Sequence, residues 1–327
     1  MNIINTGVNP TGVAYTDNKV YVANNNNYGI ANEDSVSVIN LDDYTVNKIH
    51  DPSFNEPYTI TIHGKYAYIT NSNSDSITIM NIKNDKVVDI IEGLDGPSGF
   101  VAHKNIGYVN NYGGPDGVKS GNGNTISVVD LKTKLIIDTI IINPTIPAAP
   151  ARLAISPNGK YVYCINYVNG EMGTGTMSII NTKTNKIIYT IYGFSGPFDI
   201  ALTPNGKEAY VTNFGSNNFA PFGTTVSVID LKKFSIKNIT TGIQPSGVAI
   251  SPNGKFAYVT NYNTLYAGEN FTKLTPGVGT VSVIDTKTYK VINTIQVNQG
   301  PANICTDGNN IYVTNFISNV LNIIKVN

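Results

Sequence analysis

One tetrapeptide recurs seven times along the chain, and this repeat restricts the fold more than any other feature. Its commonest form is Tyr-Val-Thr-Asn, and the copies are Tyr21–Asn24, Tyr68–Asn71, Tyr108–Asn111, Tyr163–Asn166, Tyr210–Asn213, Tyr258–Asn261 and Tyr312–Asn315. Units that recur every 40–55 residues or so cannot bury their apolar faces alone and must stack on one another. The sequence therefore predicts an array of similar units.

Each unit reads as four β-strands, as the stretch 242–297 shows. Its apolar runs are short, rich in β-branched and aromatic residues, and bounded by Gly, Pro, Asn or Asp, which is typical of strands and turns. Ser251–Lys255 has the composition of a tight turn, with Pro252 fixing one dihedral angle and Gly254 adopting a positive φ. We therefore expect four antiparallel strands, a to d, in every unit.

Two further markers also occur seven times. A proline opens strand a at Pro10, Pro57, Pro97, Pro150, Pro197, Pro245 and Pro301. Strand c recurs at Ser35–Asn40, Ser76–Asn81, Thr125–Asp130, Thr176–Asn181, Thr225–Asp230, Thr280–Asp285 and Val320–Lys325. Three independent markers thus agree on seven units.

The tetrapeptide inside a four-strand repeat resembles the YVTN family of β-propellers, and the resemblance covers the whole chain. It implies an all-β, seven-bladed β-propeller of four-stranded antiparallel blades in a single domain, 1–327. Departures from the pattern are mild: Asn110 replaces Thr in blade three, and Cys164 and Ile165 replace Val and Thr in blade four. The expected blades are approximately 7–52, 53–92, 93–146, 147–192, 193–241, 242–297, and 298–327 plus 1–6.

The two ends of the chain predict how the ring closes. The last unit stops after its third strand, whereas Asn2–Thr6 matches the fourth-strand pattern and leads directly into the first blade. We expect this N-terminal strand to complete the last blade, which would remove the free edges of an open array.

Composition limits the classes of partner. The 22 basic and 22 acidic residues give a formal net charge of +0, so no global field attracts nucleic acid or a membrane. No apolar segment is long enough to span a bilayer, and the amino terminus lacks signal-peptide features, which favours an intracellular site, or a virion if the source is viral. An exported protein is expected instead if a signal has been removed. Cys164 and Cys305 fall in different blades and are expected to be free, buried thiols, and we expect a monomer without a cofactor.

The loops that join strand b to strand c lie with the d–a loops on one face, called the top here. Five of these b–c loops are long: 25–34, 112–124, 167–175, 214–224 and 262–279. Long loops on a rigid scaffold commonly carry function, although surface insertions also accumulate at little cost to stability. The top is therefore the expected binding face.

Two groups of side chains are candidate ligand contacts at the top. Arg152 and Asp199 stand two residues after the opening proline of adjacent blades, where an ion pair would either join the blades or hold a carboxylate or phosphate. An aromatic residue follows the motif asparagine in five blades, at Tyr112, Tyr167, Phe214, Tyr262 and Phe316. These rings could form a stacking platform, or they could pack on the neighbouring blade's proline. The motif asparagines themselves are expected to be structural.

Charge divides between the two faces. Acidic residues dominate the top loops at Glu33, Asp34, Asp75, Asp116, Glu171 and Glu269, against Lys119 and Lys273. Lysines dominate the a–b and c–d turns, at 65, 83, 86, 104, 132, 134, 160, 183, 186, 207, 232, 233, 255, 287 and 290. Either lysine simply suits exposed turns, or this underside meets an acidic polymer or surface.

Catalytic motifs are not evident. His50, His63 and His103 share no pocket and have no metal-ligand spacing, and the loop 113–124 with Asp116, Asn122 and Asn124 matches no EF-hand, which leaves calcium binding there open. We therefore expect a non-enzymatic scaffold whose top face holds a macromolecule, most readily a protein. One alternative is a small-ligand binder or a lactonase- or lyase-like enzyme at the channel mouth. A second is nucleic-acid binding, against which the single arginine and the lack of Trp argue.

Overall fold

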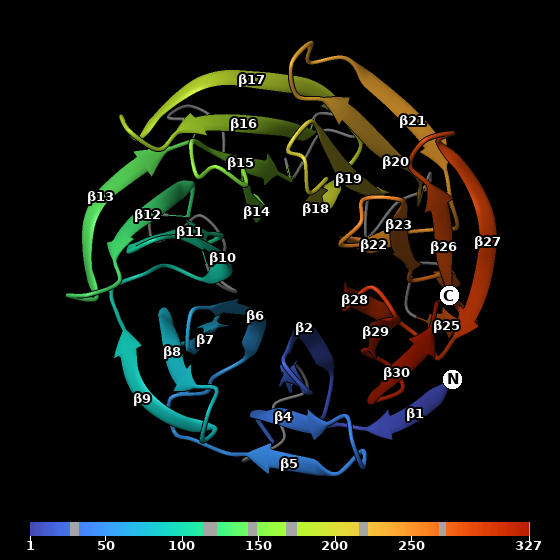
Figure 1. The fold of residues 1–327 in the computed structure, drawn as a ribbon, viewed down its shortest axis with the longest axis horizontal. Coiled ribbons are helices and arrows are strands. Elements are labelled where there is room, and N and C mark those ends of the chain that lie inside the picture. Colours follow the sequence, from blue (N-terminus) through green and yellow to red (C-terminus); the bar gives the residue numbers. More distant parts are fainter. Residues whose placement is uncertain are drawn as a thin grey trace.

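A computed structural model describes residues 1–26, 33–113, 123–142, 149–167, 175–215, 222–267 and 273–326. Seven four-stranded antiparallel sheets surround a central axis, as blades do in a β-propeller (Figure 1). The predicted fold class is thus confirmed. Within these ranges no helix is long and apolar enough to cross a membrane.

The blades follow one another in chain order. Blades one to three are β2 (Pro10–Thr16), β3 (Lys19–Asn24), β4 (Ser35–Asn40) and β5 (Val46–Ile49); β6 (Pro57–His63), β7 (Tyr66–Asn71), β8 (Ser76–Asn81) and β9 (Lys86–Ile91); and β10 (Pro97–His103), β11 (Ile106–Asn111), β12 (Thr125–Asp130) and β13 (Leu135–Ile141). Blades four and five are β14 (Pro150–Ile155), β15 (Tyr161–Asn166), β16 (Gly175–Asn181) and β17 (Lys186–Phe194); and β18 (Pro197–Leu202), β19 (Glu208–Gly215), β20 (Phe222–Asp230) and β21 (Ile236–Thr240). Blade six is β22 (Pro245–Ile250), β23 (Phe256–Asn261), β26 (Gly279–Asp285) and β27 (Lys290–Val297).

Blade seven contains both ends of the chain. It consists of β28 (Pro301–Thr306), β29 (Asn310–Asn315), β30 (Val320–Lys325) and, on its outer side, β1 (Asn2–Asn5). β1 pairs antiparallel with β30, with Asn2 opposite Ile323 and Asn5 opposite Val320. The predicted closure of the ring by the N-terminal strand is confirmed, and the chain ends lie near each other in Figure 1.

The motif asparagine joins strands b and c inside each blade. In blades one to six its Nδ2 donates to two hydroxyls on strand c, as Asn261 does to Thr280 Oγ1 and Ser282 Oγ, both at 3.0 Å. In five blades its Oδ1 also accepts a backbone N–H from the preceding d–a loop, such as that of Gly242 at 3.0 Å. The structural role expected for these residues is therefore present, with hydroxyls as additional partners.

Polar side chains at the third motif position join neighbouring blades in three cases, whereas Thr70 and Thr260 bond within their own blade. Thr212 Oγ1 donates to the Ser246 carbonyl of the next blade, and Thr314 Oγ1 donates to that of Thr11, each at 2.8 Å. Asn110, the departure from the motif in blade three, donates to the Pro150 carbonyl at 2.6 Å and so replaces the threonine bond. The motif thus specifies contacts within blades and between them.

Glycine is required where the innermost strands approach most closely. A Cβ on Gly12 would lie 2.8 Å from the Thr59 Cα, and one on Gly247 would lie 2.9 Å from the Asn303 Cα. Both contacts are shorter than real Cβ contacts, so a side chain there would push adjacent blades apart.

Apolar clusters between successive blades form the core. One cluster holds Val283 from blade six with Ile304 and Val313 from blade seven, and another joins Val22 of blade one to Ile323 of blade seven. The core is therefore a ring of interfaces, and closing it buries the last one.

Truncating a buried valine in these interfaces should destabilise the protein. Val228 and Val283 are 4% and 8% exposed, so Val228→Ala or Val283→Ala should each cost about 1–3 kcal/mol, mainly through the cavity that remains. Val88→Ala, at a 49% exposed site on β9, is the control and should change stability by less than about 0.5 kcal/mol. Thermal melts check this; equal melting temperatures for the buried and exposed variants would contradict it.

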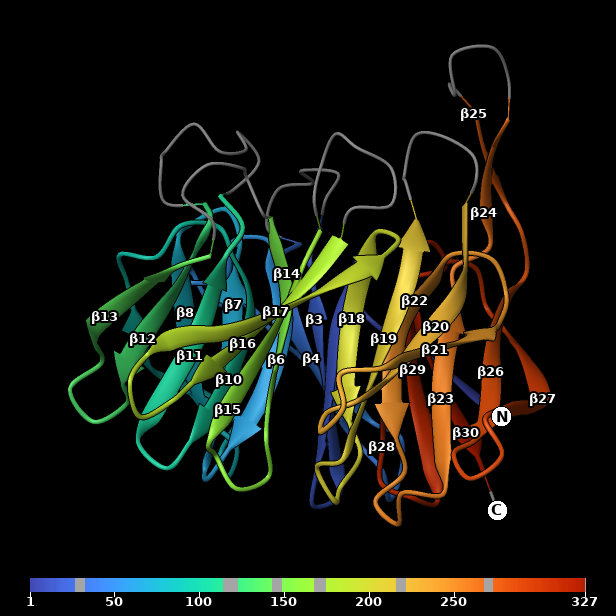
Figure 2. The same cartoon turned by 90° about the horizontal axis from the view of Figure 1, so that it is seen from above.

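The turns and the long insertion in blade six complete the fold. Gly254 has the predicted positive φ, +70°, inside the 251–255 turn. The insertion 262–279 was expected to be a loop, but part of it forms a hairpin of β24 (Thr264–Ala267) and β25 (Lys273–Pro276), which extends beyond the ring in Figure 2. The long insertion therefore contains an extra antiparallel pair of strands.

Candidate functional site

The candidate site lies at the top mouth of the central channel. Strands β2, β6, β10, β14, β18, β22 and β28 line the axis, and each begins at the top with its proline (Figure 1). The second residue after these prolines is Gly12, Thr59, Gly99, Arg152, Asp199, Gly247 or Asn303. Arg152 and Asp199 are the charged members of this set.

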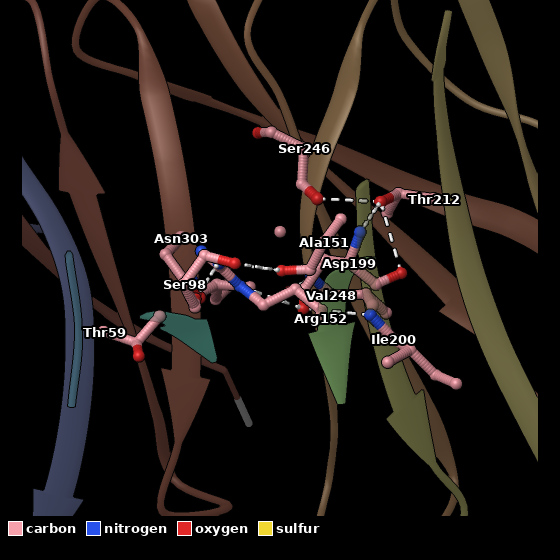
Figure 3. Close-up of polar contacts among 12 residues, drawn as sticks. Thr59, Ser98, Ala151, Arg152, Asp199, Ile200, Thr212, Ser246, Val248 and Asn303 are labelled. Atoms are coloured by element: carbon pink, nitrogen blue, oxygen red, sulfur yellow. Dashed lines mark hydrogen bonds and ion pairs between the residues drawn. The ribbon is translucent and has the colours of Figure 1, made fainter. Parts of the chain in front are cut away.

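The Arg152 side chain contacts three other blades, and Figure 3 shows its polar neighbours Ser98 and Asp199. Its Nη1 donates to the Ser98 carbonyl at 2.6 Å and to its own neighbour's carbonyl, Ala151, at 3.3 Å. Its Cζ lies 4.6 Å from the centroid of the Tyr58 ring and 5.8 Å from that of Phe198, within the range of cation–π attraction. Arg152 is 8% exposed, and among the described residues only Nη1 of its guanidinium has a hydrogen-bond acceptor. Nε faces the Asp199 carboxylate, and Nη2 has no acceptor among the described residues.

Asp199 joins three blades. The expected ion pair is present, although it is long, with 3.9 Å between Arg152 Nε and Asp199 Oδ1. The same carboxylate accepts the backbone N–H of Ile200 at 2.9 Å and that of Val248, in blade six, at 3.0 Å (Figure 3). Burial raises the pKa of Asp199, while Arg152 and the two N–H groups act in the opposite direction. The carboxylate thus serves mainly as a link between blades, and the arginine keeps most of its donors.

Aromatic rings surround Arg152, but they form two groups rather than one platform. Phe214 lies 5.2 Å from Phe198 and 6.1 Å from Tyr262, as distances between ring centroids. The second group is Tyr112, Tyr58 and Tyr167. The pKa of Tyr112 is raised, first by burial of its hydroxyl and then by the nearby Tyr58 and Tyr167 hydroxyls, although the residue as a whole is 37% exposed.

The five rings predicted as a platform therefore have different environments. Phe214 is buried, Tyr167 and Tyr262 are half-buried, and the Tyr167 hydroxyl donates to the Gly215 carbonyl of the next blade at 3.1 Å. Phe316 has no ring contact with another aromatic residue of the described chain. The rings of these two groups come from blades two to six.

Two residues of the mouth were not predicted. Tyr58 and Phe198, which lie on either side of the Arg152 guanidinium, directly follow the opening proline of their blades. The other residues at this position are Thr11, Ser98, Ala151, Ser246 and Ala302. The repeat alignment that singled out Arg152 could therefore have found both rings one position earlier.

The top acids that the structure describes are largely structural. Asp34 accepts the backbone N–H of Glu56 at 3.2 Å, and Asp75 accepts that of Gly96 at 2.8 Å, both in the next blade. Glu33 is half-buried, whereas Asp116, Lys119, Glu171, Glu269 and most of the 113–124 loop lie outside the described residues, and so the calcium question stays open.

The remaining candidates give no catalytic arrangement. His63 contacts the Lys104 carbonyl through Nε2 at 2.7 Å on the underside, far along its strand from the mouth. Cys164 is buried and Cys305 half-buried; they form no disulfide. Within the described ranges, no three residues of the His, Cys, Asp and Glu types are grouped so that they could hold a metal ion.

Comparison with known proteins identifies the fold alone. No family model and no curated protein matches the sequence. Hydrazine synthase of Kuenenia stuttgartiensis is 18% identical with a TM-score of 0.80, over 100% of this chain and 98% of that one. The Cps50 (Swd1) β-propeller domain of Myceliophteria thermophila is 12% identical with a TM-score of 0.73, over 100% of both chains. A chain of the mitotic checkpoint complex is 11% identical with a TM-score of 0.74, over 99% of this chain and 91% of that one. Because 1433 chains match and these three are so distant in sequence, the likeness selects no single function.

Proposed function

We propose that this protein is a non-enzymatic binding scaffold whose top face holds a protein partner at the channel mouth. The observation that carries the proposal is the concentration of aromatic rings around one arginine on one face. Tyr, Phe and Arg are enriched in the cores of protein interfaces, where a few such side chains supply most of the binding energy. The mitotic checkpoint complex, an assembly by its name, offers an analogy for a propeller in such a role.

The mouth provides both kinds of contact that a protein partner needs. Tyr112 presents a ring that is 37% exposed, and Arg152 places its guanidinium 4.6 Å from the centroid of the Tyr58 ring. A partner segment with an apolar side chain and a carboxylate would satisfy both. We also propose that the chain belongs to the YVTN repeat propellers, because the motif recurs seven times and its asparagine makes the same pair of hydrogen bonds to strand c in blades one to six.

A pulldown from the native source tests the function. Tyr112→Ala should reduce recovery of the partner at least about tenfold, as truncation of an interface tyrosine commonly does. The matched control is Tyr192→Ala on β17, because Tyr192 is also exposed, at 72%, but lies on the outer wall. Equal recovery with both variants would contradict the proposal.

A small anionic ligand at the mouth is the second candidate, and Arg152 Nη2, which has no acceptor among the described residues, favours it. An increase in melting temperature with inorganic phosphate or a small dicarboxylate, absent in Arg152→Gln, would support this candidate over a protein partner.

A further inference from the structure

The underside of the ring carries a dense set of lysines that the proposed top-face function does not use. We define the underside as the a–b and c–d turns and the strand residues that directly flank them. Blades two to six contribute three lysines each: 65, 83 and 86; 104, 132 and 134; 160, 183 and 186; 207, 232 and 233; and 255, 287 and 290. Blades one and seven contribute only Lys19 and Lys325. The fifteen lysines of blades two to six form an arc, which we call the lysine crescent.

Few carboxylates oppose the crescent, and those that do are occupied. The same part of the underside holds five: Asp85, Glu208, Asp130, Asp230 and Asp285. The last three accept backbone N–H groups of their own c–d turns at 2.7–3.1 Å, which lowers the pKa of each. Asp85 accepts the Tyr21 hydroxyl and Lys19, and Glu208 accepts the Tyr289 hydroxyl. These groups shape the turns; Asp130, Asp230 and Asp285 also attract the nearby Lys132, Lys232, Lys233 and Lys287 without forming an ion pair within 4.0 Å.

The lysines themselves are nearly all without a carboxylate partner. Among the described residues, Lys134 is the one crescent lysine with a carboxylate within 4.0 Å, that of Asp89. Fifteen lysines against the five underside carboxylates and Asp89 leave a net charge of +9 on one side of a chain whose total is +0. On the underside of blades one and seven, acidic residues outnumber basic ones. There are two lysines, Lys19 and Lys325, and four aspartates, Asp17, Asp42, Asp43 and Asp307.

We propose that the lysine crescent docks this protein on the headgroups of an anionic lipid bilayer. The turns of the blades end along one side of the ring in Figure 2, so the crescent extends over five blades of one face. Lysines close to such a surface each add to binding through their charge, without specific geometry. Away from the underside the chain has 13 carboxylates and five Lys or Arg residues, so the field would orient the top mouth away from the bilayer.

The same face suits nucleic acid less well. The chain's single arginine, Arg152, lies at the mouth, so the underside offers no bidentate donor for phosphates or base edges. Among the described turn residues, the exposed aromatic side chain is Tyr44, which belongs to blade one and not to the crescent. Base stacking, which supplies much of the affinity for single strands, is therefore not provided.

Vesicle co-sedimentation of the full chain tests the proposal. The probe is phosphatidylcholine vesicles with about 30% phosphatidylserine at about 50 mM salt, and pure phosphatidylcholine vesicles are the reference. Lys183→Glu/Lys232→Glu reverses two exposed crescent lysines, and Lys48→Glu/Lys237→Glu reverses two exposed lysines of the outer strands β5 and β21 with the same change in net charge. Thermal melts establish that both variants remain folded.

We expect binding to the anionic vesicles only, and at least about tenfold weaker binding for the crescent variant. The control should stay within about twofold of the parent, and raising the salt should release the protein. Absence of binding to anionic vesicles, equal losses in both variants, or tighter binding to a mixed-sequence DNA duplex than to the vesicles would overturn the proposal. A top-face partner lost in Tyr112→Ala but kept in the crescent variant would leave the two functions separately established.

Discussion

Removing residues 1–6 should lower the melting temperature by about 5–15 °C, which corresponds to a loss of about 3–6 kcal/mol. The deletion abolishes the ladder between β1 and β30 and the bonds from Thr6 N and Oγ1 to the Asn319 carbonyl, at 3.1 and 3.0 Å. It also exposes the edge of β30, and a free strand edge promotes association between molecules. Differential scanning calorimetry and light scattering measure the two effects.

The control for this deletion keeps the strand and removes only a side chain. Ile3→Ala changes a residue that is 53% exposed and leaves the backbone ladder in place, so it should melt within about 2 °C of the parent. If the deletion variant had the same melting temperature as Ile3→Ala, the N-terminal strand would not stabilise the closed ring.

Replacing one motif asparagine should cost about 3 kcal/mol, as much as a large cavity in the core. Asn261 is fully buried, and Asn261→Ala would leave three groups without their partner: the buried Ser282 hydroxyl and the half-buried Thr280 hydroxyl and Gly242 N–H. Unpaired buried polar groups are destabilising because they lose their bonds to water without replacement. Denaturant unfolding measures the free-energy change.

Asn293→Ala is the matched control. Asn293 lies exposed on β27, and its side chain accepts one hydrogen bond, from the Thr294 N–H at 2.8 Å. Its replacement should cost less than about 1 kcal/mol. If Asn261→Ala were no more destabilising than this control, the motif would not have the structural role that its contacts indicate.

The repeat made most of the fold predictable, because the same residue types recur at the same positions of every blade. Tyr, Thr and Asn at fixed positions specify where strand b lies relative to strand c and to the next blade, and seven copies fix the number of blades. Closure was predictable for the same reason, since Asn2–Thr6 carries the pattern that blade seven lacks.

The site was less predictable, because it depends on where side chains extend after the ring has formed. Arg152 and Asp199 hold equivalent positions in adjacent blades, and this indicated that they pair. The long arginine side chain also reaches Tyr58, two blades away. Asp34 and Asp75 were predicted as part of an acidic top, whereas backbone N–H groups of the next blade occupy them. Such contacts depend on the packing of loops, which a pattern along the chain does not encode.

Two faces with different chemistry emerge from one repeat. The top combines rings and an arginine that suit a specific partner, whereas the underside presents lysines that suit an extended anionic surface. A protein held on a bilayer by one face would present the other to the solution, so the two proposals are compatible although each is tested separately.

Site-specific photo-crosslinking in the native lysate is the most direct test of the top-face claim. A photoreactive phenylalanine is placed at position 112 in one sample and at position 192 in another, because both positions hold exposed tyrosines on different faces. The account predicts one crosslinked partner from position 112 and none from position 192. A partner crosslinked from position 192, with none from position 112, would contradict it.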